Sequence, residues 1–349
     1  MTGPRAVVVS LEDWDDVWRR NQHLAHRLVS LGYVRELVFI QPPRKRTQAE
    51  WSPEPGIRVI SPPLHVRPAL GGFRLSAFWL RRHWCEPDDF LWINNAPLGR
   101  WLPLAVSCHD VTDDWRESAQ GWATRRRLIR AEDRLARTST TIVCSDVLQQ
   151  RWLERYGLRP AVVPNAVDQR TFDAAPVHEL PRPGTHVGYV GTLHESRLDV
   201  DLVLEVAGLP VVDQLHLVGP VHLSPDTQAR LASHPSIRVH GPVPATEVPS
   251  WLKAFDVLLL PHLVSPFTLS LDAIKAHEYL ATDRPVVATA TSGFQSLQAE
   301  ALSVVPAQDF ASAVEAAIGT RPRERRPVVD WNDRVHAFAD AAGLSRQPR

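Results

Sequence analysis

Lys275 and Glu278 lie one helical turn apart in the stretch IKAHEYLATDRPVVAT, residues 274–289. Lysine is scarce in this 349-residue chain, which otherwise has only Lys45 and Lys253. A lysine can neutralise a phosphate, and a carboxylate can accept hydrogen bonds from two hydroxyl groups. An exposed pair at this spacing would instead be a surface ion pair, which contributes roughly 0.2–0.5 kcal/mol to helix stability. The two residues are therefore candidates for half of a ligand site, with a solvated helix face as the alternative.

A second polar group follows the apolar run LAVSC and consists of His109, Asp110, Asp113 and Asp114. The carboxyl ends of parallel strands are where α/β proteins bind ligands. A histidine beside a carboxylate can hold a substrate or transfer a proton. A polar loop with a solvated His109 is the alternative, but the four residues together favour a functional site.

Gly191, in VGYVGTL, separates an apolar run from a segment with helical periodicity. A glycine lets the backbone approach an anion, and the N–H groups that follow favour a phosphate. The pattern is not G-x-G-x-x-G, so the dinucleotide fingerprint is missing and an ordinary turn is equally expected. Asp199 and Asp201 lie at the start of the next segment, where carboxylates usually complement the helix dipole rather than bind a metal.

Two further segments combine charge with aromatic side chains. EDWDDVWRRNQ, residues 12–22, follows the first apolar run, and Asp15 or Asp16 can cap a helix there. RPALGGFRLSAFWLRRHW, residues 67–84, places four arginines among four Phe and Trp residues. Such a segment could contact a membrane surface or a substrate. A half-buried helix whose arginines reach into solvent is the simpler interpretation.

Composition narrows the class of protein. Hydrophobic residues make up 44% and charged residues 22% of the chain, which favours a packed core over disorder. The formal net charge is zero, which argues against a general nucleic-acid binder. Cys85, Cys108 and Cys144 have neither metal-site spacing nor the even number of a disulfide framework. The first residues do not resemble a signal peptide, and no apolar run has the length of a membrane span. We therefore expect a cytoplasmic protein that could be membrane-associated at its surface.

Short runs rich in Val, Ile and Leu recur along the chain and are nearly continuous rather than alternating, as strands covered on both faces require. They predict strands at residues 6–10, 36–43, 57–63, 90–95, 104–110, 141–145, 161–165, 186–191, 215–219, 237–241, 256–261, 285–289 and 302–306. Helical periodicity lies between them, at 17–31, 119–137, 147–156, 200–207, 226–232, 248–254, 271–281, 311–318 and 331–343. This alternation predicts an α/β protein with doubly wound parallel sheets.

The chain divides at APVHELPRPGTH, where three prolines and a glycine separate two series of strands. We expect two Rossmann-like domains facing across a cleft, with ligands at the carboxyl ends of the strands. The predicted first domain covers residues 1–174, the linker 175–186 and the second domain 187–325. The remaining segment, 326–349, contains an amphipathic helix.

The ordered set of motifs resembles the GT-B glycosyltransferases of the large retaining family four. VVPNAVD at 162–168 resembles the PNGVD that closes the N-terminal domain of that family. The motifs that follow keep the family's order: GYVGTL, LHLVGP, VHGPVP, FDVLLLP and KAHEYLATDRPVVAT. RRNQHLAHRLVSLG and HDVTDDW resemble a branch that includes cell-wall and exopolysaccharide enzymes.

The resemblance implies a retaining, metal-independent hexosyltransferase without a cofactor. Its partners would be a nucleotide-diphosphate sugar such as a UDP or GDP sugar, held mainly by the second domain, and an acceptor held mainly by the first. The acceptor would be a glycan, a lipid-linked sugar or a small natural product, and no nucleic acid is expected. The segment 326–349 would cross back to the N-terminal domain.

The resemblance also suggests roles for single residues. Glu278 matches the second glutamate of the family's E-x7-E motif, which binds the ribose, and Arg197 falls where the family has a lysine on the diphosphate. Val243 lies in the loop that meets the base. The implied donor site comprises Gly191, Thr192, Arg197, Val243, Ser270, Leu271, Asp272, Lys275 and Glu278. The implied catalytic residues are His109 and Asp110, and the acceptor-binding candidates are Asp15, Trp18, Arg20 and Asn21.

Several positions depart from the family's pattern. Ser270 replaces the first glutamate of E-x7-E, and Thr192 replaces the usual diphosphate arginine, which leaves Arg197 and Lys275 to neutralise the leaving group. Two alternatives follow: a nucleotide-sugar epimerase of the same fold, and a non-catalytic nucleotide-sugar-binding subunit. A nicotinamide-dependent dehydrogenase is disfavoured by the missing glycine fingerprint.

Overall fold

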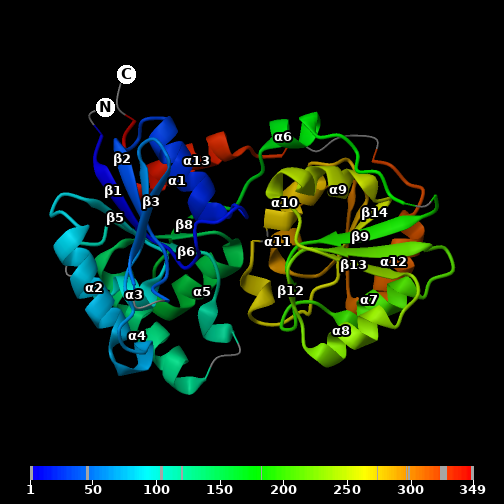
Figure 1. Ribbon diagram of the computed structural model, residues 1–349, viewed down its shortest axis with the longest axis horizontal. Coiled ribbons are helices and arrows are strands. Elements are labelled where there is room, and N and C mark those ends of the chain that lie inside the picture. The colour runs from blue at the N-terminus through cyan, green and yellow to red at the C-terminus, as the bar shows by residue number, and fades with distance from the viewer. Residues whose placement is uncertain are drawn as a thin grey trace. The chain divides into compact units, whose positions relative to one another are not determined.

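The computed structural model describes residues 3–44, 47–102, 105–118, 121–181, 183–272, 274–295, 297, 299–322 and 328–346. The chain forms two compact units (Figure 1). Unit 1 comprises Met1–Pro164 together with Trp331–Arg349, and unit 2 comprises Asn165–Asp330. Each unit is a largely parallel sheet with helices around it, so the expected doubly wound α/β architecture is confirmed.

The described part of unit 1 contains an eight-stranded sheet with the order β3-β4-β2-β1-β5-β6-β7-β8. Its pairs are parallel except β3 with β4, which is antiparallel. The strands are β1 (Arg5–Val9), β2 (Glu36–Ile40), β3 (Ala49–Glu54), β4 (Ile57–Ser61), β5 (Phe90–Ile93), β6 (Cys108–Val111), β7 (Thr140–Val143) and β8 (Ala161–Val162). Its α-helices are α1 (Arg20–Ser30), α2 (Gly72–His83), α3 (Ala96–Gly99), α4 (Trp122–Thr138), α5 (Asp146–Tyr156) and α13 (Trp331–Ala342).

The C-terminal helix α13 belongs to unit 1, where it packs against α1. The Trp331 ring stacks on His23 with the ring centroids 4.6 Å apart, and the Phe338 ring lies 4.8 Å from that of Trp92. Trp331 and Phe338 are at most 1% exposed. Helix α13 therefore completes the core of unit 1, although unit 2 separates it in the sequence from the rest of that unit.

The described part of unit 2 contains a six-stranded parallel sheet with the order β13-β11-β9-β14-β15-β16. These strands are β9 (His186–Val190), β11 (Gln214–Val218), β13 (Ile237–Gly241), β14 (Val257–Leu260), β15 (Val286–Thr289) and β16 (Leu302–Val305). A separate short pair joins β10 (Leu193–His194) to β12 (Val221–His222). Its α-helices are α6 (Gln169–Ala174), α7 (Val200–Ala207), α8 (Pro225–Ala232), α9 (Val248–Ala254), α10 (Ile274–Leu280), α11 (Ser292–Gln295) and α12 (Phe310–Ala317).

The unit boundary lies ten residues before the end of the predicted first domain. Residues 165–174 fall in unit 2, because α6 packs against α9 and Asn165 hydrogen-bonds Asp272. The backbone N–H of Asn165 donates to the Asp272 carboxylate. The PNAVD motif therefore straddles the boundary between units.

Each sheet reverses its direction of growth at one point. In unit 1 this switch lies between β1 and β5, and in unit 2 between β9 and β14. Ligands of open α/β sheets bind beyond the carboxyl ends of the strands at such a switch. Among the described residues, no helix combines the length and apolar character that crossing a membrane would require.

Candidate functional site

In unit 2, Lys275 lies directly against the turn that follows β9. Gly191 has φ +151°, and a Cβ atom built on it would lie 1.7 Å from Cε of Lys275. Only glycine therefore permits both the backbone conformation and the close passage of the lysine side chain. The Gly191 N–H donates to the Val218 carbonyl at 2.7 Å, which joins the turn to the end of β11.

The turn and the lysine are joined by Tyr189. The Lys275 ammonium lies 5.9 Å from the centroid of the Tyr189 ring, and the Tyr189 hydroxyl donates to the Thr192 carbonyl at 3.1 Å. The positive charge of Lys275 is thus placed beside Gly191 and Thr192, on the carboxyl side of β9. An anion at this turn would meet both the lysine and the glycine backbone.

Arg197 is a second cation of the same region. Burial lowers the pKa of His262 to about 3, and the charges of Lys275 and Arg197 lower it further. The pKa of His194 falls to about 4, for burial first and then the charge of Arg197. Two cations therefore lie close to both histidines, which are neutral at pH 7. The Arg197 guanidinium also lies 5.3 Å from the Phe267 ring.

Glu278 is half-buried on α10, one turn after Lys275. Burial raises the pKa of Glu278, and the charges of Lys275 and His277 oppose that rise. A deprotonated carboxylate here can accept hydrogen bonds from hydroxyl groups of a ligand.

Tyr279, which the sequence reading missed, fixes α10 to the sheet. Its hydroxyl accepts a hydrogen bond from the Val190 N–H at 2.9 Å and donates to the Val190 carbonyl at 3.1 Å. Tyr279 is fully buried. The helix that carries Lys275 and Glu278 is therefore held in register with the turn at Gly191.

The residues before α10 are engaged within their own loop. The Ser270 hydroxyl donates to the Phe267 carbonyl at 2.6 Å, and Leu271 is 7% exposed. The Asp272 carboxylate contacts His277 at 3.2 Å and also accepts from Asn165. The donor roles implied for Ser270, Leu271 and Asp272 stay predictions, and the contacts of Ser270 and Asp272 hold this loop in place.

Val243, the residue implied for the base, follows β13 and is half-buried against the core of unit 2. Gly241 precedes it with φ +72°, which lets the chain turn at the end of the strand. The predicted base contact through its backbone stays a prediction.

In unit 1, Arg20 and Asp110 form a buried ion pair. Nε and an Nη of Arg20 each lie 3.0 Å from a carboxylate oxygen of Asp110, and the two side chains are 4% and 0% exposed. Arg20 also donates to the Pro164 carbonyl at 3.3 Å. This bidentate geometry joins the start of α1 to β6. Arg20 and Asp110 bind one another, and their predicted roles toward acceptor and donor stay predictions.

Asn21 belongs to a buried amide network at the switch point of this sheet. Its Nδ2 donates to the Ser10 hydroxyl at 3.0 Å and to Oδ1 of Asn94 at 2.8 Å. Asn94 in turn donates to the Asp110 carbonyl at 3.0 Å. The network ties together the ends of β1, β5 and β6. The pair Asn94 and Asn95 in FLWINN was the available signal for it, and the sequence reading did not use it.

His109 lies inside β6 and is 2% exposed. Burial lowers its pKa to about 3, so the ring is neutral at pH 7. The ring centroid lies 6.2 Å from that of Trp152, on α5, whereas the next residue, Asp110, bonds α1. Neighbouring strand residues point to opposite faces. His109 therefore lies in the core on the α5 side, and its catalytic role stays a prediction.

Glu12 is a candidate that the sequence reading missed. Burial raises its pKa to about 7; the nearby charges of Asp113 and Asp15 raise it further, and Arg19 lowers it. Its backbone N–H donates to the Ser10 hydroxyl at 2.9 Å, so it follows β1 at the switch point. A carboxyl group that titrates near pH 7 can act as a general acid or base. The run of acids in EDWDDVW was the only signal in the sequence.

Asp15 and Trp18 lie in the same loop. The exposed Asp15 binds Arg19 at 3.0 Å and accepts from the Val17 N–H. Trp18 packs edge-on against Trp14, with centroids 6.0 Å apart. Their predicted contact with an acceptor is not tested by these interactions.

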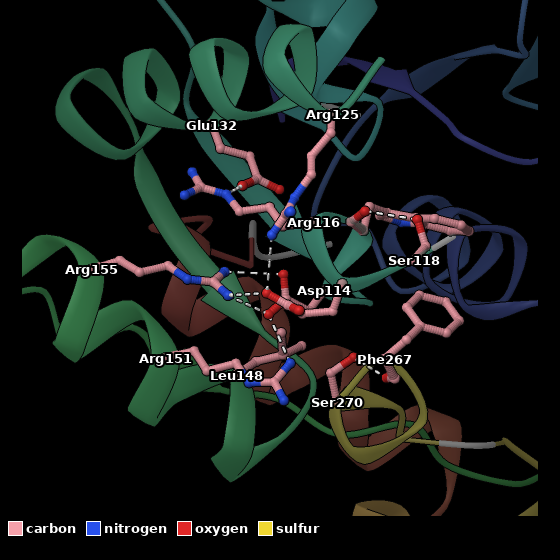
Figure 2. Close-up of polar contacts among 12 residues, drawn as sticks. Asp114, Arg116, Ser118, Arg125, Glu132, Leu148, Arg151, Arg155, Phe267 and Ser270 are labelled. Carbon is pink, nitrogen blue, oxygen red and sulfur yellow. Dashed lines mark hydrogen bonds and ion pairs between the residues drawn. The ribbon is translucent and has the colours of Figure 1, made fainter. Parts of the chain in front are cut away.

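The loop after β6 is fixed by arginines from α5. Arg151 and Arg155 bind the fully buried Asp114 carboxylate at 2.7 and 2.6 Å (Figure 2). Burial alone would raise the pKa of Asp114, but the hydrogen bonds and charges of these arginines lower it. Arg116 reaches the other way to Glu132 on α4 (Figure 2). The loop that carries Asp113 is therefore held between α4 and α5.

Among the described residues, no three or more His, Cys, Asp or Glu side chains are grouped so as to hold a metal ion. Metal independence itself remains an expectation.

Two family profiles match most of the chain between them. Residues 17–170 match glycosyltransferase family 4, and residues 184–320 match glycosyl transferases group 1. TuaH of Bacillus subtilis, provisionally described as a teichuronic acid biosynthesis glycosyltransferase, is 25% identical over 97% of both chains.

Solved structures share the fold over nearly the whole length. Sucrose-phosphate synthase from Thermosynechococcus elongatus superposes with a TM-score of 0.71 at 18% identity, covering 98% of this chain and 96% of its own. WaaG, a glycosyltransferase involved in lipopolysaccharide biosynthesis, gives 0.66 at 15% identity over 97% of each chain. A protein structure from E. coli, described as trehalose-6-phosphate bound with UDP-2-fluoro glucose, superposes with a TM-score of 0.67 at 12% identity. The match covers 97% of this chain and 95% of that one. The matched residues lie in both units.

Proposed function

Because this chain is a GT-B glycosyltransferase similar to family four, we propose that it moves a sugar from a nucleotide-diphosphate sugar to a hydroxyl acceptor with retention of configuration. In this reaction the bond between the anomeric carbon and the diphosphate oxygen breaks, and both electrons leave with the diphosphate. A bond forms between the anomeric carbon and the acceptor oxygen, and the proton of the acceptor hydroxyl passes to the leaving diphosphate. The negative charge that grows on the leaving diphosphate needs stabilisation.

The observation that carries the proposal is the position of Lys275 beside the Gly191 turn. The diphosphate would bind at this turn, between Lys275 and Arg197. The two cations supply the charge that an arginine at position 192 would otherwise supply. A fixed lysine at a glycine turn stabilises a phosphate as a compact positive charge.

Glu278 would bind the ribose. Its carboxylate can accept from both hydroxyl groups of a ribose, and it lies one turn from the lysine that would bind the phosphates. The raised pKa of Glu278 predicts tighter nucleotide binding as pH increases, because the deprotonated form is the better acceptor.

The acceptor would bind in unit 1, at the network of Ser10, Asn21 and Asn94, with Glu12 close by. The name of TuaH supports a cell-envelope polysaccharide or its precursor as the acceptor. A hexose would be the transferred sugar, and no metal ion would be needed because the two cations neutralise the diphosphate.

A thermal-shift panel of UDP, GDP, ADP and dTDP tests the donor site. One diphosphate should raise the melting temperature of the wild type, and Glu278→Ala should lose most of that rise. Equal protection of both proteins would exclude Glu278 from the ribose site. Protection by none of the four would contradict nucleotide-sugar use.

Turnover of the matching nucleotide sugar then tests the reaction. Release of nucleoside diphosphate that depends on an added glycan or lipid-linked acceptor supports transfer. Interconversion of the sugar without an acceptor would indicate an epimerase, and binding without turnover by any acceptor would indicate a non-catalytic subunit.

A further inference from the structure

One face of unit 1 is formed by α2, α3 and α4, which lie side by side (Figure 1). Large apolar side chains are exposed on this face, which is unusual away from binding sites. Phe78 on α2 is 67% exposed, Leu75 is 49% exposed, and Trp122 at the start of α4 is 74% exposed. Trp101, which follows α3, is 40% exposed.

Arginines lie among these side chains and join the helices into one surface. The guanidinium of Arg74 on α2 lies 5.8 Å from the Trp101 ring, and that of Arg100 lies 4.8 Å from it. Arg100 also donates to the Arg127 carbonyl of α4 at 3.5 Å. Arg74 and Arg100 therefore both contact the Trp101 ring, and these contacts connect α2 with α4 at the surface.

The basic side of α4 follows a single stripe. Trp122, Arg126, Arg130 and Arg134 repeat every four residues, so they lie along one side of the helix and are exposed. The charges of Arg134 and Arg130 act on Arg100, where they add to burial in lowering its pKa. The stripe therefore faces the Arg100 and Trp101 corner.

Acidic residues are scarce in the segments that form this face. The sequence from 62 to 85 has four arginines and no acidic residue. The two acids of α4, Glu132 and Asp133, both bind Arg116 on another side of that helix. A strongly basic and apolar surface thus exists on a chain whose formal net charge is zero.

We propose that this face of α2, α3 and α4 docks unit 1 on an anionic lipid bilayer. Phe78, Leu75 and Trp101 enter the interfacial layer, and the arginines bind acidic headgroups while their stems cover apolar surface. A DNA duplex would use the arginines, but its bases are stacked inside the helix and offer the exposed Leu75 and Phe78 no apolar partner. The combination of charge with aliphatic exposure favours lipid.

Vesicle co-sedimentation of the full-length chain tests the proposal. The probes are neutral phosphatidylcholine vesicles and vesicles with about one third phosphatidylglycerol. We expect at least tenfold stronger partitioning onto the anionic vesicles and loss of that preference at high salt. The double variant R130E/R134E should lower partitioning at least tenfold, and Phe78→Ser should lower it severalfold.

Matched controls separate this surface from general charge effects. R159E/R170E makes the same charge change at two exposed arginines elsewhere, and Val177→Ser removes another exposed apolar side chain. Both should partition within about twofold of the wild type. All variants should keep the melting temperature of the wild type, which shows that they are folded.

Three results would overturn the proposal: equal partitioning onto both kinds of vesicle, the same loss in the control R159E/R170E, or no partitioning at all. Binding of a DNA duplex at the concentration that saturates vesicles, abolished by R130E/R134E but not by Phe78→Ser, would instead assign the surface to nucleic acid. The outcome is independent of whether the chain transfers a sugar.

Discussion

The role proposed for Lys275 depends on its position in the fold rather than on a sequence motif. Its side chain fills the space over Gly191 that a Cβ would take, beside the threonine that occupies the place of a diphosphate-binding arginine in the resembling family. Position 192 therefore carries no cation, and α10 places the ammonium group of Lys275 at the same turn.

Lys275→Ala should therefore weaken binding of the nucleoside diphosphate about tenfold or more, because a charge-assisted hydrogen bond contributes roughly 1.5–3 kcal/mol. Binding of the nucleoside monophosphate should fall much less. Titration calorimetry with both ligands measures the difference. Lys253→Ala, which removes the lysine that donates to the Ala175 carbonyl, is the matched control and should change neither affinity. Equal losses for the two ligands would place Lys275 away from the distal phosphate.

Candidate residues at a predicted strand end or on one helical turn could be identified from the sequence. Residues that only the tertiary fold brings together could not. Lys275, Glu278 and Gly191 were recognisable because local spacing placed them at a strand end or on one helical turn. Glu12 was hidden in a run of acids, because only the fold shows which carboxyl group is desolvated enough to raise its pKa. His109 was adjacent to Asp110 in sequence, but the alternation of a strand sends the two side chains to opposite faces.

At the scale of elements, continuous apolar runs predicted the central strands well, because a parallel strand buried on both faces must be apolar throughout. Strand β3 was missed because its sequence, AEWSPE, is mostly exposed and contains a proline, as an edge strand tolerates. The short helices α3, α6 and α11 were also missed. Helices of four to six residues have too few turns to show a periodicity.

Three histidines form a row across neighbouring strands of unit 2. Nδ1 of His186 lies 2.9 Å from Nε2 of His216, and Nδ1 of His216 lies 2.9 Å from Nε2 of His240. Each neutral ring can donate one hydrogen bond and accept another. Burial lowers the pKa of His216 to about 3, and the charges of His240 and His186 add to the effect.

Acid should therefore destabilise the protein through this row. The folded pKa of His216 lies below the unfolded value near 6.5, so its contribution is complete above pH 6.5 and is lost progressively as pH falls toward 3. Urea unfolding at pH 7.5, 6 and 5 should show a falling free energy of unfolding. In His216→Gln the fall should be shallower by up to about 1 kcal/mol per pH unit.

His65→Gln is the control for this measurement, because His65 is exposed and outside the row. Its variant should follow the wild-type dependence. The same slope in His216→Gln as in the wild type would mean that the row does not govern acid stability.

At the scale of the molecule, the chain is two units of which the second lies within the sequence of the first. The alternation of strands and helices predicted the two doubly wound sheets, and the proline-rich stretch placed their separation approximately. The exact boundary depended on tertiary packing of α6, which no local pattern reports. The amphipathic helix was visible in the sequence, and the resemblance, rather than any local pattern, implied that it would join the N-terminal domain.

Phe338→Ala should destabilise unit 1 alone, because truncating a fully buried phenylalanine costs about 3–5 kcal/mol. Calorimetric unfolding should show the transition of unit 1 move to lower temperature. The transition that the bound nucleoside diphosphate raises, which we assign to unit 2, should stay in place. Phe310→Ala, equally buried on α12, should give the reverse pattern. A single shared shift in both variants would show that the units unfold as one.

The position of α13 in the sequence has a consequence for biosynthesis. A ribosome delivers the strands of unit 1 first, yet the helix that covers Trp92 emerges only after the whole of unit 2. At about 5–20 residues per second, an interval on the order of ten seconds separates the synthesis of α13 from the synthesis of the sheet of unit 1. During that interval its apolar surface is open to chaperones, whereas unit 2 is contiguous and can fold as soon as it leaves the exit tunnel.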